Sequence, residues 1–153
     1  MDNVIVRQAT QEDVAVLLIF EQGIIKAERP YDETLKPDPI SYYSIIDLVA
    51  NPDAEVLVAE VDGTIVGSGF AIIKEGKPYC KHTDYAYLGF MYTDPECRGM
   101  GINSKIIAGL KDWAFARDLH EVRLTVYDDN AGAIKAYEKV GFKKHIAEMR
   151  LVK

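Results

Sequence analysis

Residues 84–104 read DYAYLGFMYTDPECRGMGINS and contain three different patterns in succession. The apolar and aromatic run 84–93 is typical of a β-strand. Residues 94–101 form a polar loop that ends in two glycines. Apolar residues then recur at helical spacing, which predicts a helix from this loop to about Asp118; they are Ile102, Ile106, Leu110 and Trp113. The stretch therefore predicts a strand, a glycine loop and an amphipathic helix.

The loop sequence Arg98-Gly99-Met100-Gly101 favours an anion site at the start of this helix. Glycines let the backbone approach a ligand closely, and the free N–H groups of a helix N-terminus attract an anion such as a pyrophosphate. Arg98 adds a positive charge. The loop is not a P-loop, because no Gly-Lys-Ser/Thr follows, and Ser104 replaces the third glycine of the dinucleotide fingerprint. The alternative is a glycine turn that only leads into the helix.

Outward from this unit, the sequence alternates between strand and helix patterns without a linker or repeat. Asp62-Gly63 between two apolar runs is a strong hairpin signal. The predicted strands are 4–7, 55–60, 64–74, 84–93, 122–127 and 144–152, and the predicted helices are 10–27, 41–49, 102–118 and 131–140. This order predicts a three-layer α-β-α domain of the α/β class with one mixed, mostly antiparallel sheet of six to seven strands.

Composition narrows the class of protein. The chain has 153 residues, 48% hydrophobic and 27% charged, which is ordinary for one globular domain. We therefore expect a single domain over residues 1–153. The longest apolar run, Val14–Phe20, is far below the roughly 20 residues of a membrane span. The start lacks a signal-peptide pattern, and two distant cysteines indicate a reducing compartment. The net charge of −6 argues against nucleic acid. We expect a cytoplasmic protein without membrane or nucleic-acid partners.

Two stretches resemble the signatures of a known family. Residues 91–102, MYTDPECRGMGI, are similar to the acetyl-CoA-binding motif of the GNAT superfamily of N-acetyltransferases. Residues 130–142, NAGAIKAYEKVGF, resemble the family's second signature, and the predicted strand 122–127 lies between the two. Arg98 and Gly101 match the first two fixed positions of the family's loop, whereas Asn103 stands at the third, where the family has Gly or Ala.

The resemblance implies a GNAT-like fold whose sheet is splayed between strands 84–93 and 122–127 to admit acetyl-CoA. Gly89 favours a bulge or a close backbone approach in the first of these strands. The family also implies acetyl-CoA as co-substrate, no metal, and a homodimer. The residues that the resemblance assigns to acetyl-CoA are Met91, Tyr92, Thr93, Arg98, Gly99, Met100, Gly101, Ile102, Asn103, Ser104, Asn130 and Tyr137.

Tyr137 is the candidate general acid. It lies seven residues after Asn130, so the two share one face of the predicted helix. A tyrosine hydroxyl has an ordinary pKa of about 10 and can protonate a departing thiolate. The resemblance places it near the sulfur of the co-substrate. The alternative is an aromatic residue at the edge of the core.

The general base and the acceptor site are less well defined. Related enzymes often carry a carboxylate on the strand before the glycine loop, but strand 84–93 has no Glu. Asp84, His82, Tyr85 and Tyr87 are the candidates, acting through water, and each could instead be an ordinary strand-end or half-buried residue. The family places the acceptor near residues 28–38, where Glu28, Tyr31 and Asp32 are the candidate substrate-binding residues. Carboxylates here favour a cationic amine; the alternative is a solvated acidic loop.

These patterns together predict an N-acetyltransferase that moves an acetyl group from acetyl-CoA to a primary amine. The amine attacks the thioester directly, and the acceptor is a small cationic molecule. Two alternatives stay open: a protein lysine or N-terminal acetyltransferase, and an acyl-CoA-binding regulatory module without turnover. The missing strand carboxylate favours the second alternative.

Overall fold

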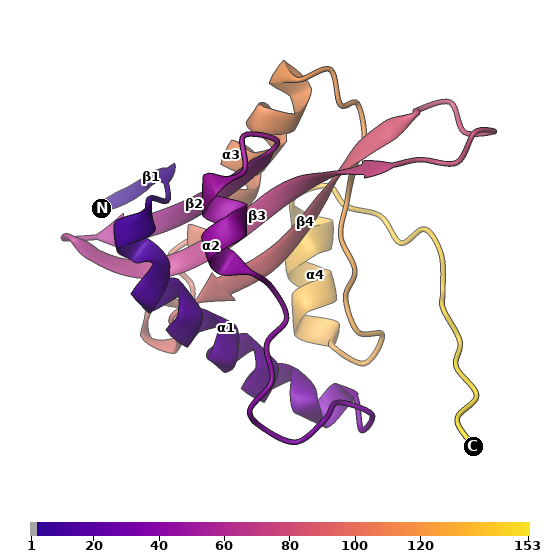
Figure 1. Cartoon of the computed structure of the whole chain (residues 1–153), viewed down its shortest axis with the longest axis horizontal. Helices are drawn as coiled ribbons and strands as arrows, with labels where there is room; N and C mark the ends of the chain where they lie inside the picture. The colour runs from indigo at the N-terminus through magenta and orange to yellow at the C-terminus, as the bar shows by residue number, and fades with distance from the viewer. Residues whose placement is uncertain (1–2) are drawn as a thin grey trace.

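The computed structural model describes residues 3–153 and is shown in Figure 1. The strands are β1 (Val4–Gln8), β2 (Ala54–Val61), β3 (Thr64–Glu75), β4 (Asp84–Thr93) and β5 (Val122–Arg123). The helices are α1 (Val14–Glu28), α2 (Ile45–Ala50), α3 (Ile102–Ala116) and α4 (Ala131–Lys139). Short 3₁₀ turns occupy Gln11–Asp13, Arg29–Tyr31 and Pro95–Cys97. Among the described residues, no helix has the length and apolar character needed to cross a membrane.

The strands form one mixed sheet in the order β1-β2-β3-β4-β5. The first three pairings are antiparallel, and β5 alone runs parallel to its neighbour β4. The hairpin between β2 and β3 turns at Asp62 and Gly63, both with positive φ, as the dipeptide predicts. The mixed, mostly antiparallel sheet is confirmed, but the described residues form five strands where six to seven were expected.

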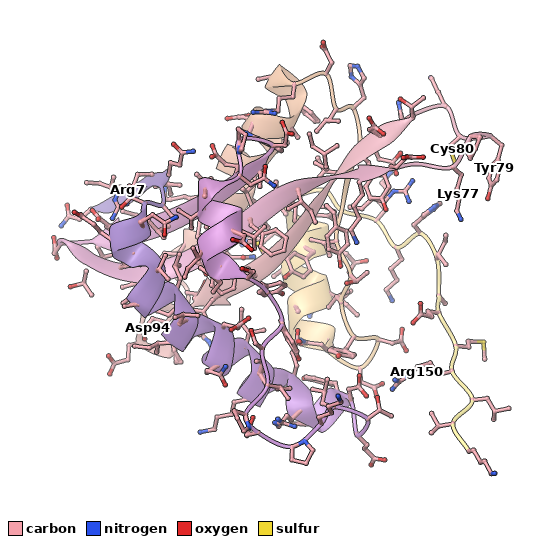
Figure 2. All side chains as sticks on the ribbon, viewed as in Figure 1. Arg7, Lys77, Tyr79, Cys80, Asp94 and Arg150 are labelled. Carbon is pink, nitrogen blue, oxygen red and sulfur yellow. The ribbon has the colours of Figure 1, made fainter. Side chains whose placement is uncertain are left out.

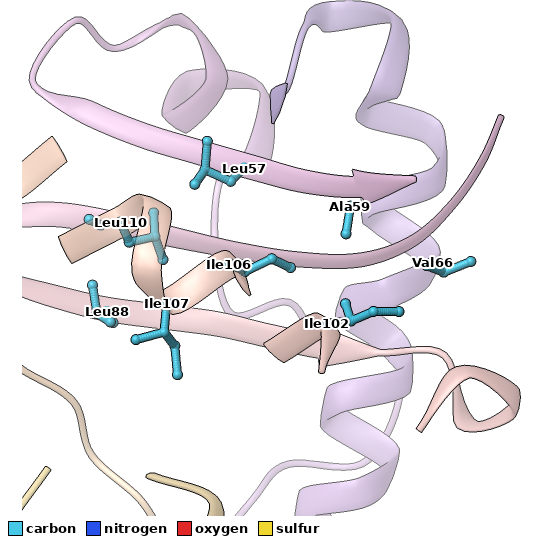
Figure 3. Packing of buried hydrophobic residues seen from close by; sticks show 9 residues of the cluster. Leu57, Ala59, Val66, Leu88, Ile102, Ile106, Ile107 and Leu110 are labelled. Carbon is cyan, nitrogen blue, oxygen red and sulfur yellow. The ribbon is translucent and has the colours of Figure 1, made fainter. Parts of the chain in front are cut away.

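Helices cover both faces of this sheet (Figure 1). Because side chains alternate along a strand, Val56 and Val58 of β2 pack with α1 and α2, whereas Leu57 and Ala59 pack with α3. Figure 3 shows Ile106 and Leu110 of α3 lying over the second face. The predicted three layers are therefore confirmed. The apolar residues that recur at helical spacing in the sequence form the buried stripe of α3.

Two predicted elements are shorter than expected for identifiable reasons. The helix predicted at 41–49 begins only at Ile45. The backbone N–H groups of Tyr42 and Tyr43 donate to the buried carboxylate of Glu21, at 2.9 and 2.8 Å, which holds this segment out of a helix. The strand predicted at 122–127 is paired only at Val122 and Arg123. The chain leaves the sheet after Arg123, so the other four residues have no strand partner.

The strand predicted at 144–152 is wrong for the single chain. These residues are exposed and carry no strand assignment. The alternation of apolar residues in this segment is typical of a strand. A strand also needs the edge of a neighbouring strand with which to pair. The segment instead runs outward past the rest of the fold (Figure 1).

Candidate active site

The site begins where β4 departs from regular pairing. Phe90 and Met91 of β4 together oppose Gly69 of β3, because the register shifts between Ser68 and Phe70. Phe90 has a φ of +59°, so this is a β-bulge. A Cβ on Gly89 would lie 2.6 Å from the Phe70 ring. The bulge and the close approach predicted at Gly89 thus both occur, one residue apart.

On the other edge of β4 the sheet opens. The parallel pairing with β5 stops at Tyr87 and Arg123, and β4 continues to Thr93 without a partner on that side among residues 3–153. The predicted splay between the two strands is therefore confirmed. The opening leaves backbone N–H and C=O groups of β4, from Leu88 onward, free to bind a ligand.

The side chains of the predicted co-substrate residues on β4 are engaged in packing. Met91 packs against the cluster beneath α3, whereas Tyr92 stacks on Phe20 of α1 with ring centroids 4.3 Å apart. Their contribution to ligand binding would therefore come from the backbone. This agrees with the role that the sequence resemblance implies for Met91 and Thr93.

The glycine loop is shaped for an anion. Gly99 and Gly101 have φ values of +84° and +75°, and a Cβ on either would meet no atom within 4 Å. Gly101 precedes the first turn of α3, and no side chain caps that turn. The N–H groups of the first turn therefore keep their hydrogen-bonding capacity. Arg98 is exposed beside them. The residues present fit the pyrophosphate of acetyl-CoA.

The other residues of this region that were predicted to bind the co-substrate lie in the first turn of α3 or just before it. Ile102 is buried in the core, while Met100 and Ser104 are exposed and Asn103 is half-buried. Asn103 is thus a helical residue whose N–H belongs to the open first turn.

The second predicted signature lies on α4. The Asn130 side chain caps this helix, since its Oδ1 accepts the N–H of Ala133 at 3.2 Å. Tyr137 is half-buried and contacts Phe142 edge to face at 6.0 Å. Burial, and to a lesser degree the nearby Glu28 carboxylate, raises the pKa of Tyr137. The hydroxyl therefore stays protonated over a wide pH range, which suits a proton donor.

The segment after α1 approaches the residues after β5. The Tyr31 and Tyr127 rings stack with centroids 5.7 Å apart, and the Tyr127 hydroxyl donates to Asp32 at 3.4 Å. Arg150 of the C-terminal segment donates to Asp32 at 3.0 Å and to Thr34 at 2.9 Å. Hydrogen bonds from Thr34 and then from Arg150 lower the pKa of Asp32 to about 2. Asp32 is thus an ionised and already paired carboxylate.

Glu28 differs from Asp32. It is the last residue of α1, it is half-buried, and it makes no ion pair with any residue from 3 to 153. The Tyr42 hydroxyl lies beside it, buried and without the geometry of a hydrogen bond to any described group. Burial raises the pKa of Glu28, and its charge contributes to the raised pKa values of Tyr43 and Tyr127. Glu28 therefore faces a group of tyrosine hydroxyls.

The candidates for the general base lie in β4 or just before it, at different distances from the opening. Asp84 is the exposed first residue of β4 and His82 precedes it. Both adjoin the β3–β4 tip, where Figure 2 shows Lys77, Tyr79 and Cys80, on the far side of the molecule from Asp94. The Tyr87 hydroxyl contacts the Thr125 hydroxyl at 2.5 Å, which places Tyr87 at the border of the opening.

Three tyrosines in this region were not predicted from the sequence: Tyr42, Tyr43 and Tyr127. The pair Tyr42-Tyr43 was read as part of a helix, and Tyr127 as part of a strand. The sequence offered one signal: Tyr42 and Tyr43 closely follow a proline-rich segment, and Tyr127 directly precedes two aspartates. Their convergence on Glu28 depends on the fold.

The sequence matches a known protein family. The acetyltransferase (GNAT) family model matches residues 22–142, so the chain belongs to the GNAT acetyltransferase family. Acetyltransferases of Yersinia pestis match it at 35% identity over 99 residues, which is 64% of this chain and 64% of theirs. A thialysine N-epsilon-acetyltransferase of Sus scrofa is 29% identical over 154 residues, covering 92% of this chain and 85% of that protein.

Solved structures share the fold at lower identity. A predicted acetyltransferase of Clostridium acetobutylicum with acetyl-CoA superposes with a TM-score of 0.72 at 21% identity, covering 97% of this chain and 96% of that one. The aminoglycoside N-acetyltransferase AAC(6')-Iy in complex with CoA gives 0.76 at 15% identity, covering 97% and 98%. These structures share the fold of this chain, which is an acetyltransferase by family.

Proposed function

We propose that this chain, acting as a single domain over residues 1–153, transfers the acetyl group of acetyl-CoA to the primary amine of a small cationic molecule. The observation that carries this proposal is the opening between β4 and β5. The opening adjoins a glycine loop fitted for pyrophosphate, and the described residues around it include Glu28 and Tyr137. An anionic co-substrate and an amine acceptor thus each have a suitable partner.

The co-substrate would extend from the glycine loop into the opening. The N–H groups after Gly101 would hold the pyrophosphate, while the unpaired backbone of β4 near Met91 and Thr93 would bind the pantetheine arm. The side-chain oxygen of Asn130 caps α4, so its amide nitrogen remains free. This nitrogen would bind the same arm. In this arrangement the thioester would lie near Tyr137.

The reaction is a direct displacement. The neutral amine attacks the thioester carbonyl and forms a C–N bond, and the carbonyl oxygen becomes negatively charged. A backbone N–H near the β4 bulge would stabilise that oxygen. The C–S bond then breaks, and Tyr137 donates its proton to the departing thiolate. The amide and CoA are the products.

The amine must lose a proton before or during attack. Tyr87 and Asp84 are the proposed acceptors of this proton through water, and Tyr87 is closer to the opening. Glu28 is a further candidate, because its raised pKa makes it a better base than an ordinary carboxylate. Its lack of an ion pair also leaves it free to bind an ammonium group. Amines are the acceptors named for the similar thialysine and aminoglycoside enzymes.

A macromolecular amine, either a lysine side chain or a protein N-terminus, is the second proposed acceptor class. Tyr31 and the acidic residues after α1 are exposed enough to meet a larger partner. A module that binds acyl-CoA without turnover is the third, favoured by the absence of Glu on β4. We also propose a cytoplasmic homodimer, in line with the sequence expectations.

A thiol-release assay with acetyl-CoA and a panel of amines tests these proposals. We expect CoA release with diamines, polyamines or aminosugars and little release with neutral amines. Release with lysine peptides alone would identify the macromolecular class. Tight acetyl-CoA binding by calorimetry without release for any amine would contradict an enzymatic function.

A further inference from the structure

A shallow cavity lies between α2 and β3, on the face of the sheet that α1 and α2 cover. Its volume is about 300 Å³. Most of its lining is apolar, and four side chains supply it: Tyr43, Leu48, Phe70 and Ile72. None of these residues has a part in the acetyl transfer described above. The cavity is therefore a second hollow whose occupant is still to be assigned.

The floor of this cavity adjoins the candidate active site. In the pairing of β3 with β4, Ile72 lies opposite Tyr87 and Phe70 lies opposite Gly89. Side chains of Phe70, Ile72 and Tyr87 pack on the same cluster, so they point to one face of the sheet. Directly opposed residues have Cβ atoms only about 4.5–5.5 Å apart. The cavity thus begins beside the proposed proton acceptor and next to the bulged part of β4.

Tyr43 reaches from the cavity to the acceptor residues. Its ring packs edge to face on Phe70 and Phe90, with centroids 5.0 and 5.7 Å apart. Burial raises the pKa of Tyr43 to about 12, and the Glu28 carboxylate and the Tyr87 hydroxyl add to this increase. The Tyr43 hydroxyl therefore lies near Glu28 and Tyr87, while its ring lines the cavity. One molecule could occupy the cavity and meet both acceptor residues.

The size and lining of the cavity suit an aromatic ring. A dry apolar cavity of about 150 Å³ is large enough for benzene, so this one has room for a ring and a short chain. Two aromatic and two aliphatic side chains line it, and the Tyr43 ring already packs edge to face on Phe70. A further ring can pack on these side chains in the same way, whereas a sugar or a polar chain would lose hydration there.

The α2 side of the same cavity carries polar groups. Ser44 and Asp47 line it, and both residues are exposed. Across residues 3–153, the Asp47 carboxylate forms no ion pair. A free carboxylate accepts a strong hydrogen bond from a hydroxyl or an ammonium group and repels another carboxylate. The lining therefore favours an apolar group that carries a hydrogen-bond donor at its far end.

We propose that this cavity holds the arm of the acceptor, and that the acceptor is an arylalkylamine whose ring carries a hydrogen-bond donor. The inference rests on the proposed acetylation of an amine and names the class of that amine. The ring packs against Tyr43, Phe70 and Ile72, its donor faces Asp47, and the short chain directs the primary amine toward Tyr87 and the opening.

The test compares three amines in the thiol-release assay: ethanolamine, phenethylamine and tyramine. We expect kcat/KM for phenethylamine to exceed that for ethanolamine at least about tenfold, because its ring leaves water on binding. Tyramine should exceed phenethylamine by about two- to fivefold, since its hydroxyl can donate to the exposed Asp47. Equal values for ethanolamine and phenethylamine would overturn the inference while confirming that the chain acetylates amines.

Two variants assign the preference to the cavity. Ser44→Phe places a ring in the cavity, so the ratio of phenethylamine to ethanolamine should fall to about one. Ser44 is exposed and its side chain makes no capping bond to α2, so the fold should be retained. Asp47→Ala should remove only the additional preference for tyramine. Ile46→Phe is the matched control, since Ile46 is 57% exposed on α2 outside the cavity lining, and it should keep both preferences. A ring preference that survives Ser44→Phe would overturn the inference.

Binding can be measured without turnover by methyl NMR spectra of the full chain. Phenethylamine should shift the Leu48 and Ile72 methyl signals in the wild type and not in Ser44→Phe, and ethanolamine should leave them in place. These shifts without CoA release from any amine would support the aryl site and contradict the proposed transfer reaction. Phenethylamine that leaves both methyl signals unshifted would overturn the inference.

Discussion

The sheet has a well-paired side, formed by β1 to β4, and an open side, where β4 meets β5. The two sides differ in how completely their strands are paired. β3 and β4 pair from Gly67–Thr93 to Glu75–Asp84, and β2 pairs with β3 from Ala54–Ile72 to Val61–Thr64. β4 and β5 share only Ala86–Val122 and Tyr87–Arg123. The buried clusters lie almost wholly on the first side, between β1–β4 and helices α1, α2 and α3.

This difference separates stability from ligand binding. The well-paired side uses its backbone hydrogen bonds and apolar side chains to hold the fold. The poorly paired side keeps N–H groups, hydroxyls and carboxylates free, and the candidate residues around the opening belong to it or face it. Substitutions on the two sides should therefore change different measured quantities.

Tyr137→Phe should produce the largest effect on the open side. The variant keeps the ring but removes the proposed proton donor, so kcat should fall by about 10²–10⁴. Water can replace the donor in part, so we expect the lower end of this range. Acetyl-CoA affinity should be nearly unchanged, and the free energy of unfolding should change by about 1 kcal/mol.

Three measurements on one preparation check this prediction: kcat, acetyl-CoA affinity and the melting temperature. Tyr79→Phe is the matched control, because Tyr79 is 84% exposed at the far tip of the β3–β4 connection. A wild-type kcat in Tyr137→Phe would exclude the general-acid role while leaving co-substrate binding untouched.

Leu110→Ala should show the opposite pattern. Leu110 is fully buried in the cluster between α3 and the sheet, so its truncation should lower the free energy of unfolding by about 2–5 kcal/mol. At temperatures where the variant remains folded, KM for both substrates should stay close to wild type. Chemical denaturation measures the loss. Leu18→Ala, at a position 44% exposed on α1, should change stability far less.

Gly101→Val tests the loop that joins the two sides. The glycine has a φ of +75° and open space where its Cβ would lie, so valine would both strain the backbone and fill the proposed phosphate position. We expect acetyl-CoA affinity to fall by about tenfold or more, roughly 1.4 kcal/mol. Titration calorimetry gives the affinity.

The control is Gly63→Val, in the hairpin between β2 and β3. Gly63 has a φ of +81° and equally open surroundings, so it carries the same backbone strain away from the loop. It should lower stability and leave acetyl-CoA affinity intact. Equal losses of affinity in both variants would show that Gly101 acts only through the fold.

Sequence patterns predicted the well-paired side accurately and the open side in part. Alternation in β2 and β3, the Asp62-Gly63 turn and the apolar stripe of α3 are local signals, so each could be read directly from the residues. The strand at 144–152 failed because pairing depends on a distant edge. The glycine loop was expected from its residues, whereas the hydroxyls of Tyr42, Tyr43 and Tyr127 meet Glu28 only after folding.

Arg150→Ala should give the smallest effect and sharpens the description of the acceptor side. Arg150 pairs with Asp32, which is held ionised because Thr34 and Arg150 lower its pKa to about 2. Removing the guanidinium would leave an unpaired carboxylate beside Tyr127, so KM for a cationic amine should fall by about two- to fivefold, the scale of one exposed ion pair. KM for acetyl-CoA should not change.

The pH dependence of this variant follows from the same shift. A lowered carboxyl pKa contributes stability that is present above the ordinary pKa of about 4 and is lost as the pH falls toward 2. The KM difference between Arg150→Ala and wild type should therefore persist from neutral pH down to about pH 4. Arg117→Ala, which breaks the exposed Arg117–Asp53 pair elsewhere, is the control and should leave KM unchanged. An unchanged or higher KM in Arg150→Ala would show that Asp32 does not meet the acceptor, leaving Glu28 as the carboxylate that does.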